Sequence, residues 1–153
     1  MNIQIGSVDN PQIVNLIREH LAAMEPTAPA ESRHALDLSG LSDDSITLWS
    51  VWDGNQLAGI GALKRISQTH AEIKSMKTAK TFLRKGIASL LLNHIIEEAK
   101  KSGYQQLSLE TGSMDFFAPA RKLYSSFGFL ECGPFEGYIE DPNSVFMTIY
   151  FKD

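Results

Sequence analysis

The sequence predicts an α/β fold, in which a mixed, mostly antiparallel central sheet carries one β-α-β crossover and has helices on both faces. Three observations lead to this class. Residues 45–78 contain three consecutive strand patterns, with a turn signal after the first. A strong helical pattern follows, ends at Gly103 and leads into a further strand, which makes the β-α-β unit. Other helical patterns begin near Pro11 and Phe117 and can cover the faces of such a sheet.

The first strand and helix occupy the N-terminal end. Residues 1–8 alternate apolar and polar side chains, as in a short strand. Asp9 or Asn10 with Pro11 then predicts the start of a helix. The apolar side chains that recur at helical spacing are Ile13, Leu16, Ile17 and Leu21. Residues 25–44 are rich in Pro, Ser and Ala and are typical of a loop, with a short helix expected around residues 32–38.

The middle of the chain predicts an antiparallel meander followed by the main helix. Strand patterns cover residues 45–52, 56–66 and 70–78, and Asp53-Gly54-Asn55 predicts a hairpin between the first two. Gly59 and Gly61 lie inside the second strand and indicate close packing of its backbone beside a neighbour or ligand. The apolar stripe of the main helix comprises Ala88, Leu91, Leu92, Ile95 and Ala99.

The C-terminal part completes the sheet. Residues 105–111 form a strand pattern, and residues 117–128 form a helix pattern that tolerates Pro119 in its first turn and stops at Gly128. Residues 129–135 and 144–151 are the last two strand patterns. Because the 153 residues contain no repeat, low-complexity segment or linker, we expect a single domain over residues 1–153.

Composition and charge exclude several classes of protein. Hydrophobic residues make up 43% and charged residues 21%, which is typical of a globular chain. The net charge of −4 gives no electrostatic reason to expect nucleic acid or an acidic membrane surface as a partner. The one cysteine, Cys132, excludes an intramolecular disulfide and a cysteine-based zinc site. The four histidines have no metal-ligand spacing, so we predict no metal; they are His20, His34, His70 and His94.

The N-terminus and the hydropathy of the chain bear on location. The first residues lack the basic start and long apolar run of a signal peptide. No apolar stretch approaches the roughly 20 residues that are needed to cross a bilayer. We therefore expect a cytoplasmic protein.

Two cations stand at the start of the main helix, in the stretch "FLRKGIASLL". Arg84 and Lys85 lie where the positive end of the helix dipole should repel them, which indicates a strongly anionic ligand. The helix N-terminus offers unpaired N–H groups, and Gly86 lets an anion approach the backbone, with small Ala88 beside it. The alternative is a basic surface turn that uses a glycine for its backbone angles.

Two segments together resemble the GNAT superfamily of N-acetyltransferases. They are "TFLRKGIASLLLNHIIEEAKKSGYQQLSLET" and "APARKLYSSFGF". The cofactor loop of that family has the pattern Gln/Arg-x-x-Gly-x-Gly/Ala, which falls here on residues 83–88 with Leu83 at the first position. The family's Leu-Tyr helix and following Gly-Phe fall on Leu123, Tyr124, Gly128 and Phe129. Phe117 stands where the family often has an asparagine.

The resemblance implies a GNAT-like fold and acetyl-CoA as co-substrate. It places the pyrophosphate on the loop formed by Leu83, Arg84, Lys85, Gly86, Ile87 and Ala88. The strands that end at Thr78 and Thr111 should then separate near their carboxyl ends. The pantetheine arm would pair with the backbone of Met76, Lys77 and Thr78 like an added short strand, and its contact with Phe117 would be apolar.

Three residues are candidates for the chemistry. Tyr124 is the candidate acid, because a phenol is protonated at neutral pH and can protonate the leaving thiolate. Glu72 and Glu110 lie on the strands that should flank the acetyl group, and either could act as base through a bound water. We prefer Glu72 slightly and expect it on the same strand face as Lys74 and Met76. The alternatives are a core tyrosine and two exposed strand-edge carboxylates.

The predicted function is therefore acetyl-CoA-dependent transfer of an acetyl group directly to a primary amine of a small molecule or peptide. One alternative is a catalytically silent acyl-CoA-binding sensor or interaction module on the same fold. Another is a different anionic ligand, such as a nucleotide, at the same helix N-terminus. Candidate acceptor-lining residues are Glu25, Glu31, Arg33 and His34. The resemblance also implies that a homodimer is common, with residues 144–151 offering a symmetric strand contact.

Overall fold

The computed structural model describes residues 1–24, 26 and 37–151 and confirms the predicted α/β fold. Seven strands form one sheet in the order β1-β2-β3-β4-β5-β7-β6. The strands are β1 (Asn2–Ile5), β2 (Ile46–Asp53), β3 (Gln56–Arg65), β4 (His70–Thr78), β5 (Gln106–Gly112), β6 (Leu130–Cys132) and β7 (Ser144–Tyr150). The helices are α1 (Pro11–Met24), α2 (Leu38–Leu41), α3 (Ile87–Lys101) and α4 (Ala118–Ser126), with short 3₁₀ turns η2 (Lys80–Phe82) and η3 (Asp115–Phe117). Strands β4 and β5 are parallel, and the other neighbouring pairs are antiparallel.

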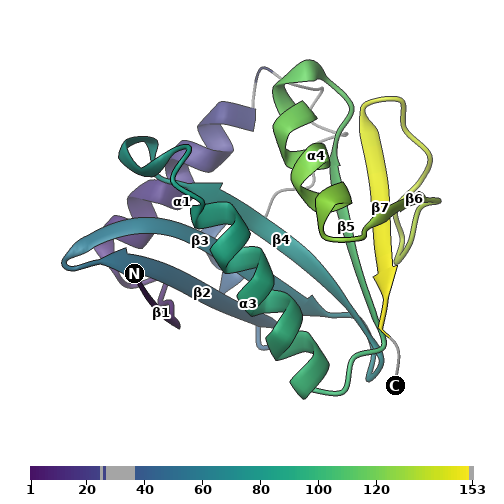
Figure 1. Ribbon diagram of the computed structural model, residues 1–153, viewed down its shortest axis with the longest axis horizontal. Coiled ribbons are helices and arrows are strands. Elements are labelled where there is room, and N and C mark those ends of the chain that lie inside the picture. The colour runs from purple at the N-terminus through teal and green to yellow at the C-terminus, as the bar shows by residue number, and fades with distance from the viewer. Residues whose placement is uncertain (25, 27–36, 152–153) are drawn as a thin grey trace.

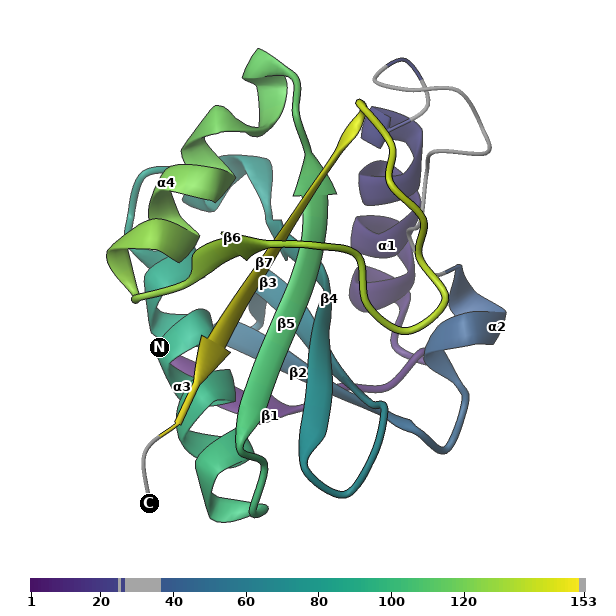
Figure 2. The ribbon, with the colours of Figure 1, turned by 90° about the vertical axis from the view of Figure 1, so that its right-hand side faces the viewer.

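The helices cover the two faces of the sheet, as predicted. Helix α1 packs on one face, in a core cluster that includes Ile13, Ile17 and Ile60. Helices α3 and α4 pack on the other face, in a cluster that includes Leu92 and Tyr124. Figure 2 shows the sheet between α1 on one side and α3 with α4 on the other. We call these the α1 face and the α3 face.

Local sequence explains where the first elements begin. Asn10 caps α1, because its side-chain oxygen accepts the N–H groups of Gln12 at 2.9 Å and Ile13 at 3.3 Å. Asp37 caps α2 in the same way, accepting the N–H of Gly40 at 2.8 Å. The short helix expected around residues 32–38 falls largely outside the described residues, and the described helix begins only at Leu38.

Glycines bring β3 and α3 close together, as the sequence indicated. A Cβ on Gly61 would lie 2.6 Å from Met76 Sδ and 3.0 Å from Ile95 Cδ1. A Cβ on Gly59 would lie 2.9 Å from Ile87 Cγ2. The backbone of β3 therefore forms the flat surface on which the N-terminal half of α3 rests.

A β-bulge interrupts β4. Ile60 pairs with Lys77 and Ala62 pairs with Lys74, so that Gly61 alone stands opposite Ser75 and Met76. Ser75 has φ 58°.

This bulge makes one of our predictions wrong. We expected Met76 on the same face as Glu72 and Lys74. Because the extra residue reverses the alternation, Met76 packs on the α3 face with the core cluster, whereas Lys74 and Glu72 contact Tyr138 on the other face.

Strands β4 and β5 separate after a short pairing. Their register runs from His70 opposite Gln106 to Ile73 opposite Leu109, and both strands continue beyond it without pairing to each other. Figure 1 shows the two strands diverging toward the end of the sheet where α3 and α4 begin. The predicted separation is therefore present, and it opens the sheet at the carboxyl ends of its parallel pair.

The C-terminal edge differs from the prediction. The expected strand over residues 129–135 is short, and β6 covers only Leu130–Cys132 before Gly133 and Pro134 end it. Strand β7 lies between β5 and β6, and residues 146–148 pair with β6. The strand contact that we expected through residues 144–151 is therefore already occupied there by β6 of the same chain.

Candidate active site

A cavity of about 320 Å³ lies beside the carboxyl end of β4, in the region where β4 and β5 have separated, and no residue of β5 lines it. From the α1 face it is lined by His20, Ala23, Met24 and Ile60, and from β4 by Met76, Lys77 and Thr78. From the α3 face it is lined by Leu83, Ala88, Leu91, Phe116, Phe117, Pro119, Ala120, Leu123 and Tyr124. Because these residues come from helices on opposite faces, the cavity crosses the plane of the sheet.

The loop before α3 lies at one mouth of this cavity. Gly86, at φ 79°, caps the helix, and the first intrahelical bond runs from Leu90 N–H to Gly86 O at 3.0 Å. The N–H groups of the first turn, beginning at Ile87, therefore have no partner within the helix. A Cβ on Gly86 would meet no atom within 4 Å, so the approach to these groups is open. This geometry is suited to an anion.

Arg84 adopts a left-handed backbone conformation in that loop, with φ 62°. A non-glycine residue there costs about 1 kcal/mol. Such strain is often found at ligand-binding segments. Arg84 and Lys85 are both exposed at the mouth, and Lys85 Nζ lies 5.4 Å from the centre of the Phe82 ring.

The structure brings the predicted cofactor residues to one place. Six of them line the cavity: Met76, Lys77, Thr78, Leu83, Ala88 and Phe117. Arg84, Lys85 and Gly86 lie at the loop, exposed. Ile87 is 2% exposed and its side chain packs on Gly59, so only its backbone is available to a ligand.

Phe117 is fixed by the end of β5. Its ring lies directly against Gly112, where a Cβ would collide with it. Arg121 of α4 donates to the carbonyl oxygens of Gly112 at 2.7 Å and Met114 at 2.9 Å. These contacts hold the apolar wall of the cavity in position.

Tyr124 reaches the cavity from α4. Its side chain is buried, and its ring makes an edge contact with Phe129 at 5.9 Å. Burial, together with the negative charge of Glu110, raises the pKa of Tyr124 to about 12. Within the described part of the chain, no hydrogen bond is made to its hydroxyl. The Tyr124 hydroxyl is therefore protonated at neutral pH and is free to make a hydrogen bond to a ligand in the cavity.

Glu110 lies on β5, near enough to Tyr124 for its charge to affect the tyrosine pKa. Burial raises the pKa of Glu110 to about 7, against the weaker opposing effects of the Ser144 hydroxyl and the Lys74 ammonium. A carboxylate with this pKa exchanges protons near neutral pH, as a general base requires.

Glu72 is in a different environment. It is 2% exposed, accepts a hydrogen bond from the Tyr138 hydroxyl at 2.6 Å and forms an ion pair with Lys74 at 3.2 Å. Burial and the negative charge of Glu72 raise the pKa of Tyr138. Neither Glu72 nor Glu110 lines the cavity itself.

Sequence reasoning missed two residues near the gap. Tyr138 comes from the connection between β6 and β7, 66 positions from Glu72, and no local pattern could have joined them. His20 was set aside because no metal-ligand spacing involved it, yet it lines the cavity from α1. Burial, aided by the charge of Lys77, lowers the pKa of His20 to about 4.

The predicted acceptor-lining residues Glu25, Glu31, Arg33 and His34 lie outside the described residues. In the ranges that the structure does describe, no cluster of three or more metal-binding side chains is present. None of the helices described is both long and apolar enough to cross a membrane.

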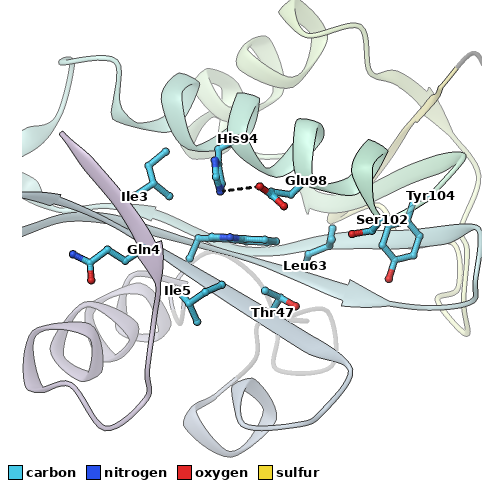
Figure 3. Close-up of a pocket in the computed structure, with 10 residues that line it drawn as sticks. Ile3, Gln4, Ile5, Thr47, Leu63, His94, Glu98, Ser102 and Tyr104 are labelled. Atoms are coloured by element: carbon cyan, nitrogen blue, oxygen red, sulfur yellow. Dashed lines mark ion pairs between the residues drawn. The ribbon is translucent and has the colours of Figure 1, made fainter.

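A second cavity, of about 420 Å³, lies on the α3 face between β1, β2 and the C-terminal half of α3 (Figure 3). His94 Nε2 and Glu98 Oε1 are 3.9 Å apart along its wall, and the His94 ring makes an edge contact with Trp49. It shares no residue with the first cavity and none with the predicted site. The candidate active site is therefore the gap between β4 and β5.

Comparison with known proteins gives consistent results. The model of the acetyltransferase (GNAT) family matches residues 11–129. The chain is 57% identical to the uncharacterized N-acetyltransferase YsnE of Bacillus subtilis (strain 168), over 97% of this chain and 98% of that protein. It is 44% identical to the uncharacterized N-acetyltransferase YedL of Escherichia coli (strain K12), over 96% and 92% of the two chains. A GNAT family acetyltransferase from Elizabethkingia anophelis, crystallised with acetyl-CoA bound, has the same fold, with a TM-score of 0.69, 20% identity and coverage of 98% and 97%.

Proposed function

Because this chain belongs to the GNAT family of acetyltransferases, for which acetyl-CoA is the co-substrate, we propose that it transfers the acetyl group directly to a primary amine of a small molecule or peptide. The observation that carries this proposal is the cavity that crosses the sheet between β4 and β5. It gives the cofactor and the acceptor separate approaches to Tyr124, which lines the cavity and whose pKa is affected by the charge of Glu110.

The pyrophosphate of the cofactor would bind at residues 83–88. The unpaired N–H groups at the start of α3, the open approach over Gly86 and the two exposed cations support this placement. Arg84 has a left-handed backbone conformation in this loop, and such strain is often found at ligand-binding segments.

The pantetheine arm would lie along β4. The pairing of β4 with β5 stops at Ile73, so the edge of β4 from Met76 to Thr78 is open toward the gap. An extended arm could add to that edge as a strand does. Phe117 and Leu123 would provide apolar contact on the opposite side.

In the reaction, Glu110 accepts a proton from the acceptor ammonium, directly or through a water. The free amine attacks the thioester carbonyl, forming the C–N bond. Collapse of the tetrahedral intermediate breaks the C–S bond, and Tyr124 donates its proton to the departing sulfur. The proton that leaves the new amide nitrogen then restores the tyrosine through solvent.

Of the two glutamates, Glu110 is the better base. Its pKa of about 7 matches neutral pH, whereas Glu72 is held by Tyr138 and Lys74. We therefore assign Glu72 to positioning Tyr138 and the β6–β7 connection.

We further propose one domain over residues 1–153 and a cytoplasmic location. For the homodimer that the family resemblance implies, we propose a contact through β6, which is one of the two edge strands of the sheet, β1 being the other. Leu130 on β6 is 73% exposed.

The test of this function measures release of free thiol from acetyl-CoA across a panel of amines, with calorimetric titration of acetyl-CoA, CoA and ATP. We expect tight binding of both CoA species, weaker binding of ATP, and amine-dependent thiol release. Binding without release by any amine would identify a silent CoA-binding module instead. Preference for ATP would indicate a nucleotide site.

Tyr124→Phe tests the proton donor. This variant keeps the ring in its core contact and removes the acid, so kcat should fall about 10²-fold while the Kd for CoA stays unchanged. An unaltered kcat would remove the acid role from Tyr124. A large change in CoA affinity would instead make it a cofactor-binding residue.

A further inference from the structure

Lys77 directs its side chain to the α1 face of the gap. It stands opposite Ile60 in the antiparallel pairing of β3 and β4, and directly opposite residues share a face. Ile60 belongs to the core cluster beneath α1. Lys77 lines the cavity there together with His20, whose pKa is influenced by the charge of Lys77.

Within the described ranges, the ammonium of Lys77 has no ion-pair partner such as the one that Lys74 has. Lys74, three positions earlier, pairs with Glu72 at 3.2 Å. Among the described residues, no carboxylate lies within ion-pair distance of Lys77, although it is half-buried in a largely apolar cavity. A charge in such a place is costly unless an opposite charge joins it.

His20 adds a donor beside this charge. Its burial and the nearby ammonium lower its pKa to about 4, so that the ring is neutral at pH 7 and presents one N–H donor. The Lys77 ammonium and the neutral His20 N–H line the same cavity and together suit a carboxylate. The carboxylate would accept a charge-assisted hydrogen bond from Lys77 and an uncharged hydrogen bond from His20.

Glu110 provides the opposite charge on the same face. Leu107 and Leu109 face the α3 cluster, so Glu110, one position further along the strand, faces the α1 side. An acceptor with its amine at Glu110 and its carboxylate at Lys77 would therefore remain on the α1 side of the sheet. The cofactor phosphates, in contrast, are expected at the loop before α3.

We propose that Lys77 and His20 bind the carboxylate of the acceptor, and that the acceptor is therefore an amino acid, an amine that also carries a carboxylate. This inference rests on the proposed acetyltransferase function of the same gap. It adds the substrate class and assigns a role to His20. Lys77 then contacts the acceptor through its side chain, whereas its backbone faces the cofactor arm.

The experiment compares amino acids with the amines that remain after their carboxylate is removed, such as tyrosine with tyramine, histidine with histamine and lysine with cadaverine. Binding of each compound to the protein saturated with CoA is measured by calorimetry, and kcat and KM by thiol release. For at least one pair, we expect the amino acid to bind and react at least about tenfold better.

Lys77→Gln should raise KM for that amino acid about tenfold or more and leave its decarboxylated partner and the Kd for CoA unchanged. His20→Leu should have a smaller effect in the same direction, and His20→Gln, which keeps an N–H donor, should recover part of it. Lys101→Gln is the matched control, because Lys101 is an exposed lysine at the far end of α3.

Three outcomes would overturn the assignment. The first is equal or better binding of the decarboxylated amines throughout the panel. The second is weaker CoA binding by Lys77→Gln, which would show that the Lys77 side chain binds the cofactor and not the acceptor. The third is an equal effect of Lys77→Gln on both members of a pair. In all three cases the wild-type protein would still release thiol when an amine is present, so the proposed function would stand. If no amine in the panel led to thiol release, the proposed function itself would be overturned.

Discussion

Glu72 and Glu110 show how two identical side chains on neighbouring strands come to differ. Glu72 forms an ion pair with Lys74 and accepts a hydrogen bond from Tyr138, whereas burial raises the pKa of Glu110 to about 7. The sequence indicated both as candidate bases and slightly favoured Glu72. It could not distinguish them, because Tyr138 comes from a distant connection.

The pH dependence of the reaction should report Glu110. A base must be unprotonated, so kcat/KM should rise about tenfold per pH unit below pH 7 and level off above it. Glu110→Gln should lower kcat/KM at pH 8 and remove this rise, whereas Glu72→Gln should keep a rise with a midpoint near 7. A rise that survives in Glu110→Gln would place the base elsewhere. The profile is measured with an acceptor whose own amine does not titrate in this range.

The proposed cofactor residues leave a clearer pattern in the sequence than the proposed acceptor residues do. Residues 83–88 are contiguous, and a glycine and two cations at a helix start leave a local pattern. His20 and Lys77 line one cavity only because α1 and the end of β4 converge there. No periodicity in the sequence records that convergence.

At the scale of elements, the sequence located most strands and helices within a few residues, because the apolar period and the Gly and Pro stops agree. It missed the bulge in β4. Ser75 gives no glycine signal there, and only the register with β3 reveals that Gly61 faces two residues. Because of the bulge, the Met76 side chain lies on the α3 face of the sheet and the Lys77 side chain lies on the α1 face.

The close packing at this bulge makes Gly61→Ala a sensitive test. The added methyl would lie 2.6 Å from Met76 Sδ and 3.0 Å from Ile95 Cδ1, so Met76 must move into the cavity or α3 must shift. We expect a loss of about 1–3 kcal/mol in the free energy of unfolding and weaker CoA binding. Urea denaturation and calorimetry measure these two effects.

Gly133→Ala is the control for that substitution, because a Cβ on Gly133 meets no atom within 4 Å. It should change neither quantity. Unchanged CoA binding by a destabilised Gly61→Ala protein would show that Met76 does not border the cofactor arm.

For the molecule as a whole, the sheet is continuous, but its two central strands, β4 and β5, pair over only a short length. Strands β1–β4 and β5–β7 share only the four register positions from His70 to Ile73, within the part of the chain that the structure describes. Helix α3 and its core cluster connect the two groups across the α3 face. We therefore expect a single cooperative unfolding transition. A cofactor bound where β4 and β5 separate should add contacts between the two groups of strands and so stabilise the folded protein.

Binding of CoA should raise the midpoint of thermal unfolding. A ligand at 100 times its Kd stabilises the native state by about 2.7 kcal/mol. For a chain of this size that corresponds to a rise of roughly 5–10 °C. Gly86→Glu should abolish the rise relative to its own unliganded midpoint, because a carboxylate then occupies the anion site. Two separate transitions, or a full shift in Gly86→Glu, would contradict this account.

The opening of the cavity onto both faces of the sheet also bears on the order of events in each turnover. On the proposed placement, donor and acceptor enter from opposite sides, so neither has to leave before the other arrives, and the protein need not store the acetyl group between two half-reactions. Initial-rate plots at several fixed concentrations of one substrate should intersect, as they do for a ternary complex, and should not run parallel.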